Sequence, residues 1–410
     1  MALAFKAPHV IKATYRIVTP MFIGDAEQKA SGISPASVKG ALRFWWRALN
    51  WGRIHQATKG NATEALKQLH DEEGKLFGTS ADNGKAARFT LRVISGNLAK
   101  TVIGTTHPEF KKQPAARYLG YGLMEAFGSK NKNTEAGQLV RECINENQTF
   151  TIQIISNIKI DESLRQALIA FGLLGGLGSR VRHGMGSITL ESLQENDKAT
   201  WVAPKNQENY ITTIQQLLKP SSETPFPPFS AFSTVSKIDL LETATTPYNL
   251  LADFGKKMLL YRSWGKDGKV LDYPSERRFT DDHDWSKGQM PSNFHPKRVI
   301  FGLPHNYGKG DHLSVTPEKH RPPLPRDAYE HDRRASPLFF HVHQIGSQYV
   351  GVSLLLPADF LPHGEKINAG GTNVPAKIEW SVLTDFLEGK DKQENMRFQN
   401  KKTVIKGRAI

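Results

Sequence analysis

Cysteine is nearly absent from this sequence, since Cys143 is the only one in 410 residues. The chain therefore forms no internal disulfide and has no cysteine-based zinc site. No stretch approaches the roughly 18 consecutive apolar residues that a membrane-spanning helix needs. The first residues also lack the separate charged, apolar and cleavage regions of a signal peptide. These absences predict a cytoplasmic protein with no membrane partner.

Acidic residues are scarce relative to basic ones. The chain has 54 Lys and Arg against 40 Asp and Glu, which gives a formal net charge of +14. Such an excess predicts a polyanionic partner, namely nucleic acid, an anionic membrane or an acidic protein. Solubility alone is the simpler explanation, but the positive charges also cluster in two motifs described below.

Hydrophobic periodicity indicates an α+β chain, and its length favours two domains. The region of residues 204–228, with its segment KPSSETPFPPF, predicts a boundary, because prolines interrupt regular structure. We expect one domain over residues 1–204 and a second over residues 205–410, with a mostly irregular stretch at 267–334. Strands are expected at 10–18, 88–95, 149–156, 186–193, 298–306, 336–344 and 349–357. Helices are expected from about residue 36 and at 62–78, 163–176, 246–264 and 374–389.

The segment GGLGSRVRHGMGSI, residues 175–188, contains two G-x-G groups that flank a cationic stretch. It has no Lys-Ser/Thr pair for a P-loop, and Val181 replaces the third glycine of a dinucleotide-binding loop. Glycines permit close approach to a sugar-phosphate backbone, and the cations can pair with phosphates. A flexible connector with solvated arginines is the alternative. The candidate RNA-binding residues here are Gly176, Gly178, Arg180, Arg182, His183, Gly184 and Gly186.

The segment SPASVKGALRFWWRALNWG, residues 34–52, is the second basic motif. Lys39, Arg43 and Arg47 are spaced to lie along one face of a helix that contains no acidic residue. Trp46 borders this face and either stacks on a base or covers the core. Gly40 costs a helix about 1 kcal/mol relative to alanine, which is easier to explain if a ligand approaches the backbone there. An ordinary solvated helix face is the alternative.

Both motifs resemble those of a known family. GLGSRVRHGMGS is similar to the signature glycine loop of the RAMP superfamily, the RNA-binding proteins of CRISPR systems. TPMFIGDAEQ and SPASVKGALRFWWRAL resemble, more narrowly, the family of the first subunit of the type III-B CRISPR effector, the Cmr complex. Shorter matches spread the resemblance over both halves of the chain. They are KLFG, ARYLGYG, VIFGLPH and RRASPLFFHVH, the last of which adds Arg333 and Arg334 to the candidate residues.

The resemblance implies two ferredoxin-like, RRM-related domains, with the glycine loop between the second helix and the last strand. It also implies a non-catalytic subunit without a cofactor or metal, in a ribonucleoprotein of antiviral defence. Such a subunit contacts the 3′ part of the guide RNA and helps to capture complementary target RNA beside other Cmr subunits. His183 is a departure, because the family often has a second arginine there.

Two other functions stay open. His183 beside Arg180 and Arg182 could act as the general base of a metal-independent CRISPR-RNA endoribonuclease. Alternatively, the cations could dock an acidic protein surface, which would make the chain an interaction scaffold. We expect valine at Gly178 or Gly184 to weaken RNA binding while leaving the fold largely intact.

Several histidines and acids have the residue types of metal ligands. The segment DDHDW, residues 281–285, precedes His295, His305, His312 and His320, but these spacings fit no metal motif, so we expect a solvated loop. His341 and His343 share a strand face with Phe339. That face is either directed at RNA or simply wet.

Overall fold

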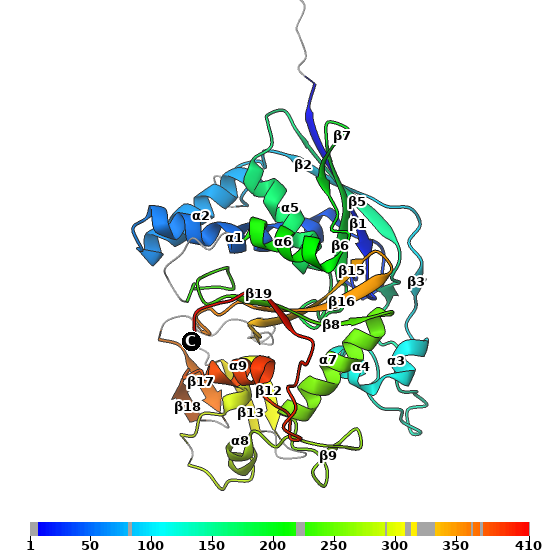
Figure 1. Cartoon of the computed structure of the whole chain (residues 1–410), viewed down its shortest axis with the longest axis vertical. Coiled ribbons are helices and arrows are strands. Elements are labelled where there is room, and N and C mark those ends of the chain that lie inside the picture. The colour runs from blue at the N-terminus through cyan, green and yellow to red at the C-terminus, as the bar shows by residue number, and fades with distance from the viewer. Residues whose placement is uncertain are drawn as a thin grey trace, which may run out of the picture.

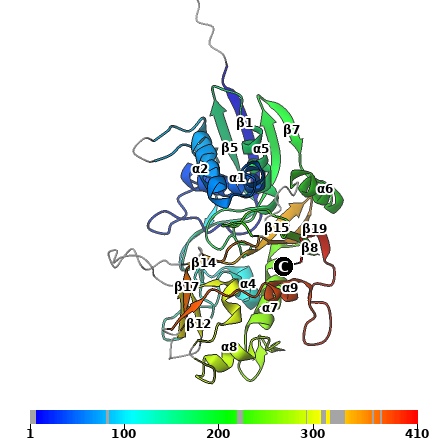
Figure 2. The ribbon, with the colours of Figure 1, turned by 90° about the vertical axis from the view of Figure 1, so that its left-hand side faces the viewer.

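The computed structural model describes residues 7–80, 84–218, 226–291, 293–307, 313–317, 333–361, 364–369 and 372–409. Two antiparallel sheets form its framework (Figure 1). The first sheet, with α1 (Pro35–Ala57) and α5 (Glu162–Leu174), lies above the second in both side views. Helices α7 (Pro247–Arg262) and α9 (Ser381–Glu388) lie below the second sheet (Figures 1 and 2). The predicted α+β class is confirmed.

The first sheet has the strand order β2-β5-β1-β6-β7. Its first four strands along the chain, with α1 and α5, follow the β-α-β-β-α-β connection of a ferredoxin-like unit. The helix α2 (Ala62–Phe77) packs beside α1, and α6 (Gln207–Leu217) packs against α5. The strands are β1 (His9–Ile17), β2 (Thr90–Ile94), β5 (Thr149–Ser156), β6 (Ile188–Glu195) and β7 (Lys198–Val202).

Local sequence explains these elements. Alternate residues of β1 are buried, and Tyr15 stacks on Phe150 of β5 at 5.5 Å between ring centroids. The Tyr15 hydroxyl donates to the Leu168 carbonyl at 2.9 Å, which fixes α5 on the sheet. Ser34 caps the beginning of α1, because its side chain accepts from the Ser37 N–H and satisfies a free donor of the first turn. The periodic pattern therefore determined which face of each element is buried.

The second sheet repeats this connection with the order β15-β16-β8-β19. Its strands are β8 (Lys237–Ala244), β15 (Leu338–Ile345), β16 (Gln348–Leu355) and β19 (Lys402–Ile405). The shorter elements are β3 (Lys100–Thr101), α3 (Pro108–Lys112), α4 (Pro114–Leu119), β4 (Cys143–Ile144), β9 (Lys269–Val270), β10 (Tyr273–Pro274), α8 (Thr280–Trp285), the 3-10 helix η1 (Lys297–Phe301), β11 (Gly302–Leu303), β12 (His305–Tyr307), β13 (Leu313–Pro317), β14 (Arg334–Ala335), β17 (Lys366–Ala369) and β18 (Thr372–Pro375).

The hydrophobic interior is continuous between the two halves of the chain. On one face of the second sheet, Phe339 belongs to the core built around β1, α1 and α5. On the other face, Phe340 stacks on Phe254 of α7 at 4.1 Å, in a core that also holds Leu119 and Met185 of the first half. Each half has its own sheet, and the division at residues 204 and 205 stays a prediction.

Three expectations for the second half are corrected. Residues 298–306 were expected to form one strand, but a buried 3-10 helix occupies their beginning, because a continuous apolar run carries no clear period. The expected helix at 374–389 begins only at Ser381, since residues 372–375 form β18 against β17. Asp282 lies in α8, where its buried carboxylate accepts from the backbone N–H groups of Lys297 and Arg298, so this part of 267–334 is not a solvated loop.

The histidine-bearing face of β15 lies inside the molecule. His341 and His343 are 3% and 1% exposed, and the His343 ring stacks on Tyr210 of α6 at 4.2 Å. Both interpretations of that face, RNA-directed or wet, are therefore wrong. His312 and His320 lie outside the described residues. Within the described ranges no group of three His, Cys, Asp or Glu could hold a metal ion, and no helix has the length and apolar character to cross a membrane.

Candidate nucleic-acid interface

The glycine loop, residues 175–187, connects α5 to β6, in the predicted order of helix, loop and strand. Its glycines are required by close approach of the chain's own atoms. A Cβ at Gly178 would lie 2.6 Å from the Phe22 carbonyl oxygen, and one at Gly184 would lie 2.8 Å from the Phe340 ring. Gly178 and Gly184 also have φ of 93° and 83°, which side chains of L-residues disfavour. The expectation that valine at either position leaves the fold intact is therefore wrong.

Arg182 points from this loop into the second half of the chain, whereas the His183 ring contacts Leu119 of the first half. The Arg182 carbonyl accepts from the Phe340 N–H at 2.9 Å, while its guanidinium donates to the Ser336 carbonyl. The same guanidinium lies 4.2 Å from the centroid of the Phe339 ring. His183 Nδ1 lies 3.0 Å from the Leu119 carbonyl oxygen. In the neutral tautomer with a proton on Nδ1, this nitrogen donates a hydrogen bond to that carbonyl. The glycine loop is thus a joint between the two halves.

The electrostatics of His183 disfavour catalysis. Burial, opposed by the Leu119 contact and assisted by nearby arginines, lowers the pKa of His183 to about 4. A general base is most effective when its pKa lies near the working pH. His183 is neutral but only weakly basic at pH 7, so the endoribonuclease alternative relies on a poor base.

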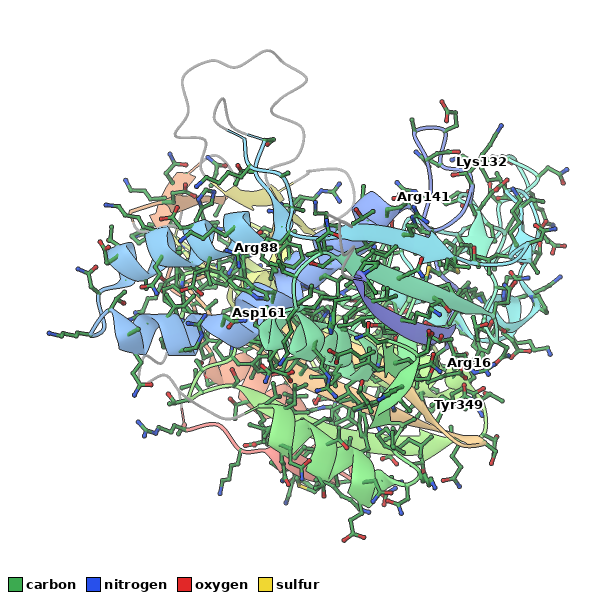
Figure 3. The ribbon with its side chains drawn as sticks, turned by 90° about the horizontal axis from the view of Figure 1, so that it is seen from above. Arg16, Arg88, Lys132, Arg141, Asp161 and Tyr349 are labelled. Atoms are coloured by element: carbon green, nitrogen blue, oxygen red, sulfur yellow. The ribbon has the colours of Figure 1, made fainter. Side chains whose placement is uncertain are left out.

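Arg180 points outward from the same loop. Its Nε donates to the Tyr121 carbonyl at 2.9 Å, and the Tyr121 side chain is 66% exposed. Burial and then the charges of Arg333 and Arg141 lower the pKa of Arg180, so both positive charges act on its guanidinium. Arg141 contacts Ser179 of the loop at 3.5 Å and lies on the same side of the molecule as Lys132 (Figure 3). Sequence reasoning missed Arg141, because no motif surrounds this single residue.

The basic face of α1 is partly neutralised by α2. Arg43 donates to the buried Glu73 carboxylate at 2.8 Å and to the carbonyls of Phe77 and Gly78 at 3.2 and 2.5 Å. Arg47 lies 3.7 Å from the other Glu73 oxygen and keeps 43% of its side chain exposed. Helix α1 itself contains no acidic residue, but Glu73 of the neighbouring α2 supplies a negative charge to its basic face. Arg43 is therefore mainly a structural anchor for the end of α2.

Trp46 is a core residue. Its side chain is 2% exposed, and its Nε1 donates to the Ser163 hydroxyl at 2.7 Å. No base can reach this ring, so of its two interpretations core packing is confirmed and RNA stacking is wrong. Gly40, in contrast, has nothing within 4 Å of a Cβ placed on it, so the backbone there faces open space.

The anchoring role of Arg43 can be tested directly. Arg43→Met is expected to lower the free energy of unfolding by about 2 kcal/mol, because the buried Glu73 carboxylate loses its closest partner. Urea unfolding followed by circular dichroism measures this change. Lys39→Met is the matched control one turn away and is expected to change stability by less than about 0.5 kcal/mol. Equal stability of the two variants would show that Arg43 is an ordinary residue of a solvated helix face rather than a structural anchor.

A pocket joins three sequence motifs. It has a volume of about 360 Å³ and lies between α1, α2, residues 229–230 and β14. It is lined by Arg47 of α1, Arg182 of the glycine loop and Arg334 of β14. Burial, together with the positive charge of Arg334, lowers the pKa of Arg182 to about 10. A groove of about 810 Å³ between α1 and α2 shares His70 with this pocket and contains Lys39 and Arg43. The pocket lining is Phe44, Arg47, Leu66, Leu69, His70, Glu73, Arg182, Phe229, Ser230 and Arg334.

The candidate cations therefore link into one set of neighbouring residues, which we call the basic line. It consists of Lys39, Arg43, Arg47, Arg182, Arg334, Arg333, Arg180 and Arg141. All of its members except Arg141 were predicted from sequence. Glu73 is the acid that lines its pocket, and Arg43 and Arg182 are already engaged by groups of this chain.

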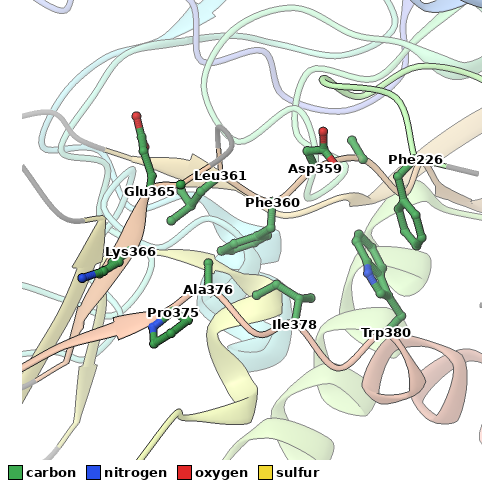
Figure 4. A pocket seen from close by; sticks show the side chains of 12 residues that line it. Phe226, Asp359, Phe360, Leu361, Glu365, Lys366, Pro375, Ala376, Ile378 and Trp380 are labelled. Atoms are coloured by element: carbon green, nitrogen blue, oxygen red, sulfur yellow. The ribbon is translucent and has the colours of Figure 1, made fainter. Parts of the chain in front are cut away.

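Other surfaces fit phosphate less well. A second pocket, of about 530 Å³, has the rings of Phe226, Phe360 and Trp380 in its walls, but among its described lining residues Lys366 is the single cation (Figure 4). On the face of the first sheet opposite α1 and α5, neighbouring strands place Arg92, Gln153 and Lys12 in one row. An RRM stacks bases on rings at such positions, and these side chains offer none.

Comparison with known proteins agrees with the motifs. Residues 14–189 match the RAMP superfamily. The CRISPR system Cmr subunit Cmr1-2 of Pyrococcus furiosus is 28% identical over 185 residues, which are 43% of this chain and 93% of that protein. The crystal structure of apo Cmr1 from Pyrococcus furiosus has a TM-score of 0.57 at 16% identity, covering 97% of this chain and 99% of that one. A chain of type III-B Cmr-beta bound to cognate target RNA has a TM-score of 0.51 at 14% identity, with coverages of 93% and 98%. The two structural similarities concern the fold.

Proposed function

We propose that this chain, whose residues 14–189 belong to the RAMP superfamily as the motifs predicted, is an RNA-binding subunit of a type III-B CRISPR Cmr effector complex. Its partners are the guide RNA, the target RNA and other Cmr subunits, in the cytoplasm. It contacts the 3′ part of the guide and helps to capture complementary target RNA without cleaving it. Two ferredoxin-like domains, over residues 1–204 and 205–410, carry this function. The similarity of the chain to the Cmr subunit and to the RNA-bound Cmr-beta chain supports the assignment.

The basic line is the observation that carries the RNA-binding proposal. Arg180, Arg333 and Arg141 come from three distant segments and still lie close enough to lower the pKa of Arg180. Like charges repel, so this clustering is unfavourable for the isolated chain and is relieved when a polyanion binds. A sugar-phosphate backbone supplies regularly spaced charges for such a set of cations.

Exposed apolar side chains close to the basic line are available for contacts with neighbouring subunits, since the Tyr121 carbonyl accepts from Arg180 and Val140 precedes Arg141. Five large apolar side chains are at least 38% exposed within residues 102–140, and exposed apolar side chains in such numbers commonly mark protein interfaces. These residues are Val102, Ile103, Tyr121, Phe127 and Val140. The scaffold function and RNA binding therefore use different groups of residues.

The test is a titration of labelled single-stranded RNA with the purified chain at several salt concentrations. The variant Arg141→Ala/Arg180→Ala/Arg333→Ala is expected to bind all sequences more weakly. Its slope of log affinity against log salt should fall by up to about 2, at roughly 0.7 for each phosphate contact with a single strand. The three side chains are outside the hydrophobic cores, so the fold should persist.

A matched control removes the same charge elsewhere. Lys266, Lys287 and Lys392 are exposed residues that lie just before β9, just after α8 and just after α9 in the chain. These three elements lie at the opposite end of the molecule from the first sheet (Figure 1). Their triple alanine variant should retain the slope. Equal slopes for both triple variants would remove the basic line from the RNA site. RNA fragments in the same reactions would instead favour the endoribonuclease, and an absence of RNA binding would favour the protein scaffold.

A further inference from the structure

The pocket between α1 and α2 has features beyond its charge. We propose that it accepts a single unstacked nucleotide of a bound single-stranded RNA, with the base against its apolar wall and the phosphate on its arginines. This inference rests on the RNA-binding function proposed above and adds a specific site to it. The pocket volume of about 360 Å³ lies within the range of roughly 300–1,000 Å³ typical of small-ligand sites.

The apolar wall is suited to the flat face of a base. Phe44 of α1 and Phe229, which is far from it in the sequence, both line the pocket. Leu66 and Leu69 of α2 complete the apolar wall. The Phe229 ring packs edge-on against the buried Trp51 ring at 5.5 Å, which holds it in place. Leu66 is 40% exposed, an unfavourable position for leucine that a stacked base would cover. Stacking on such side chains does not depend on which base is present.

The polar side of the pocket still has donors available. Arg47 lies 3.7 Å from Glu73, which is longer than a hydrogen bond, so its N–H groups can donate to a ligand. Arg334 donates one N–H to the Asp359 carbonyl at 2.7 Å, whereas its buried Nε has no acceptor among the described residues. Arg182 adds a third positive charge. Because Glu73 is already paired with Arg43, the three arginines leave an excess of positive charge in the pocket, which the phosphates on either side of one nucleotide would neutralise.

The position of the pocket indicates a strand that passes through it. The groove with Lys39 and Arg43 continues from the pocket on one side, and Arg333 follows Arg334 on the other. A duplex keeps its bases paired and stacked, so only a single strand can place a base here. An acidic peptide would satisfy the cations but would leave the two phenylalanine rings and Leu66 without a flat apolar partner. Single-stranded RNA is therefore the occupant that uses both sides of the pocket.

The experiment is an abasic scan of a short single-stranded RNA bound to the full chain. Each RNA lacks one base but keeps its phosphates, so the contacts of the basic line persist. We expect one position at which loss of the base weakens binding about 5- to 100-fold, as is typical for a stacked base. Losses below twofold at every position, with normal binding of the complete RNA, would falsify the pocket and leave the proposed function standing.

A variant separates the pocket from general effects of RNA sequence. Phe229→Ala should weaken binding of the complete RNA and abolish the extra loss at the sensitive position. Phe127→Ala is the matched control, since it removes an aromatic ring that is 79% exposed outside the pocket, and it should retain the position effect. A position effect that persists in Phe229→Ala would place the base elsewhere.

A second variant covers the case in which Phe229→Ala disturbs packing. Leu66→Asp places a negative charge at the exposed rim of the pocket, where folding tolerates it, and Leu66→Asn is the neutral comparison. We expect Leu66→Asp to bind RNA at least about tenfold more weakly than Leu66→Asn. Equal affinities would overturn the proposal. Failure of the unsubstituted chain to bind any RNA would overturn both this inference and the function on which it rests.

Discussion

Gly186→Ala is expected to destabilise the protein by about 4 kcal/mol, a loss large enough to unfold many proteins. Gly186 has φ of 63°, and a Cβ there would lie 2.0 Å from the Leu177 carbonyl oxygen. Backbone atoms cannot move aside cheaply, because Leu177 N–H also donates to the Gly186 carbonyl at 3.0 Å. Urea unfolding followed by circular dichroism measures the change.

Gly40→Ala is the matched control for this prediction. Gly40 lies in α1, and nothing is within 4 Å of a Cβ placed on it. Alanine should therefore stabilise the chain by up to about 1 kcal/mol through helix propensity. If Gly186→Ala instead kept full stability and lost only RNA binding, the glycine would be required by a ligand rather than by the fold.

Acidification from pH 7.5 to 5.5 is expected to weaken the joint between the two halves. Burial is the largest cause that lowers the pKa of His183 to about 4 and that of His341 to about 3, and it also lowers the pKa of His343 well below 6.5. The unfolded chain takes up these protons near pH 6.5, before the folded chain does. The stability that the neutral histidines contribute is therefore complete above pH 6.5 and is lost as the pH falls toward 4 and below.

The expected slope is about 1.4 kcal/mol per pH unit for each histidine, or about 4 kcal/mol for the three, between pH 6.5 and 4. His305, whose pKa burial also lowers, adds to it, while Asp239, whose pKa burial raises, acts in the opposite direction. Urea midpoints at pH 7.5, 6.5 and 5.5 measure the slope. His341→Gln should reduce it, and His70→Gln on the exposed side of α2 should not. A stability that is constant over this range would contradict the prediction.

Local pattern predicted most of the first half. The alternation of β1 and the beginning of α1 depend on neighbours within a few residues, and both lie within two residues of their expected positions. The prediction of a strand at 298–306 was wrong at its beginning, because Val299 and Ile300 are both buried. A continuous apolar run is equally compatible with a strand and with a buried 3-10 helix. The prediction of a solvated loop around Asp282 was wrong, because its partners, the N–H groups of Lys297 and Arg298, come from a later turn of the chain.

By itself, the sequence determined that this protein is a basic α+β chain with two cationic motifs, one of which is rich in glycine. These properties follow from composition, periodicity and local backbone preference. Only the tertiary structure decided which cations remain available to a ligand. Arg43 is neutralised by Glu73, 30 residues away, and Arg182 is engaged by Ser336, 154 residues away. Periodicity indicates the face on which a side chain lies, whereas the charge and shape of the opposing segment are set by how distant parts of the chain pack together.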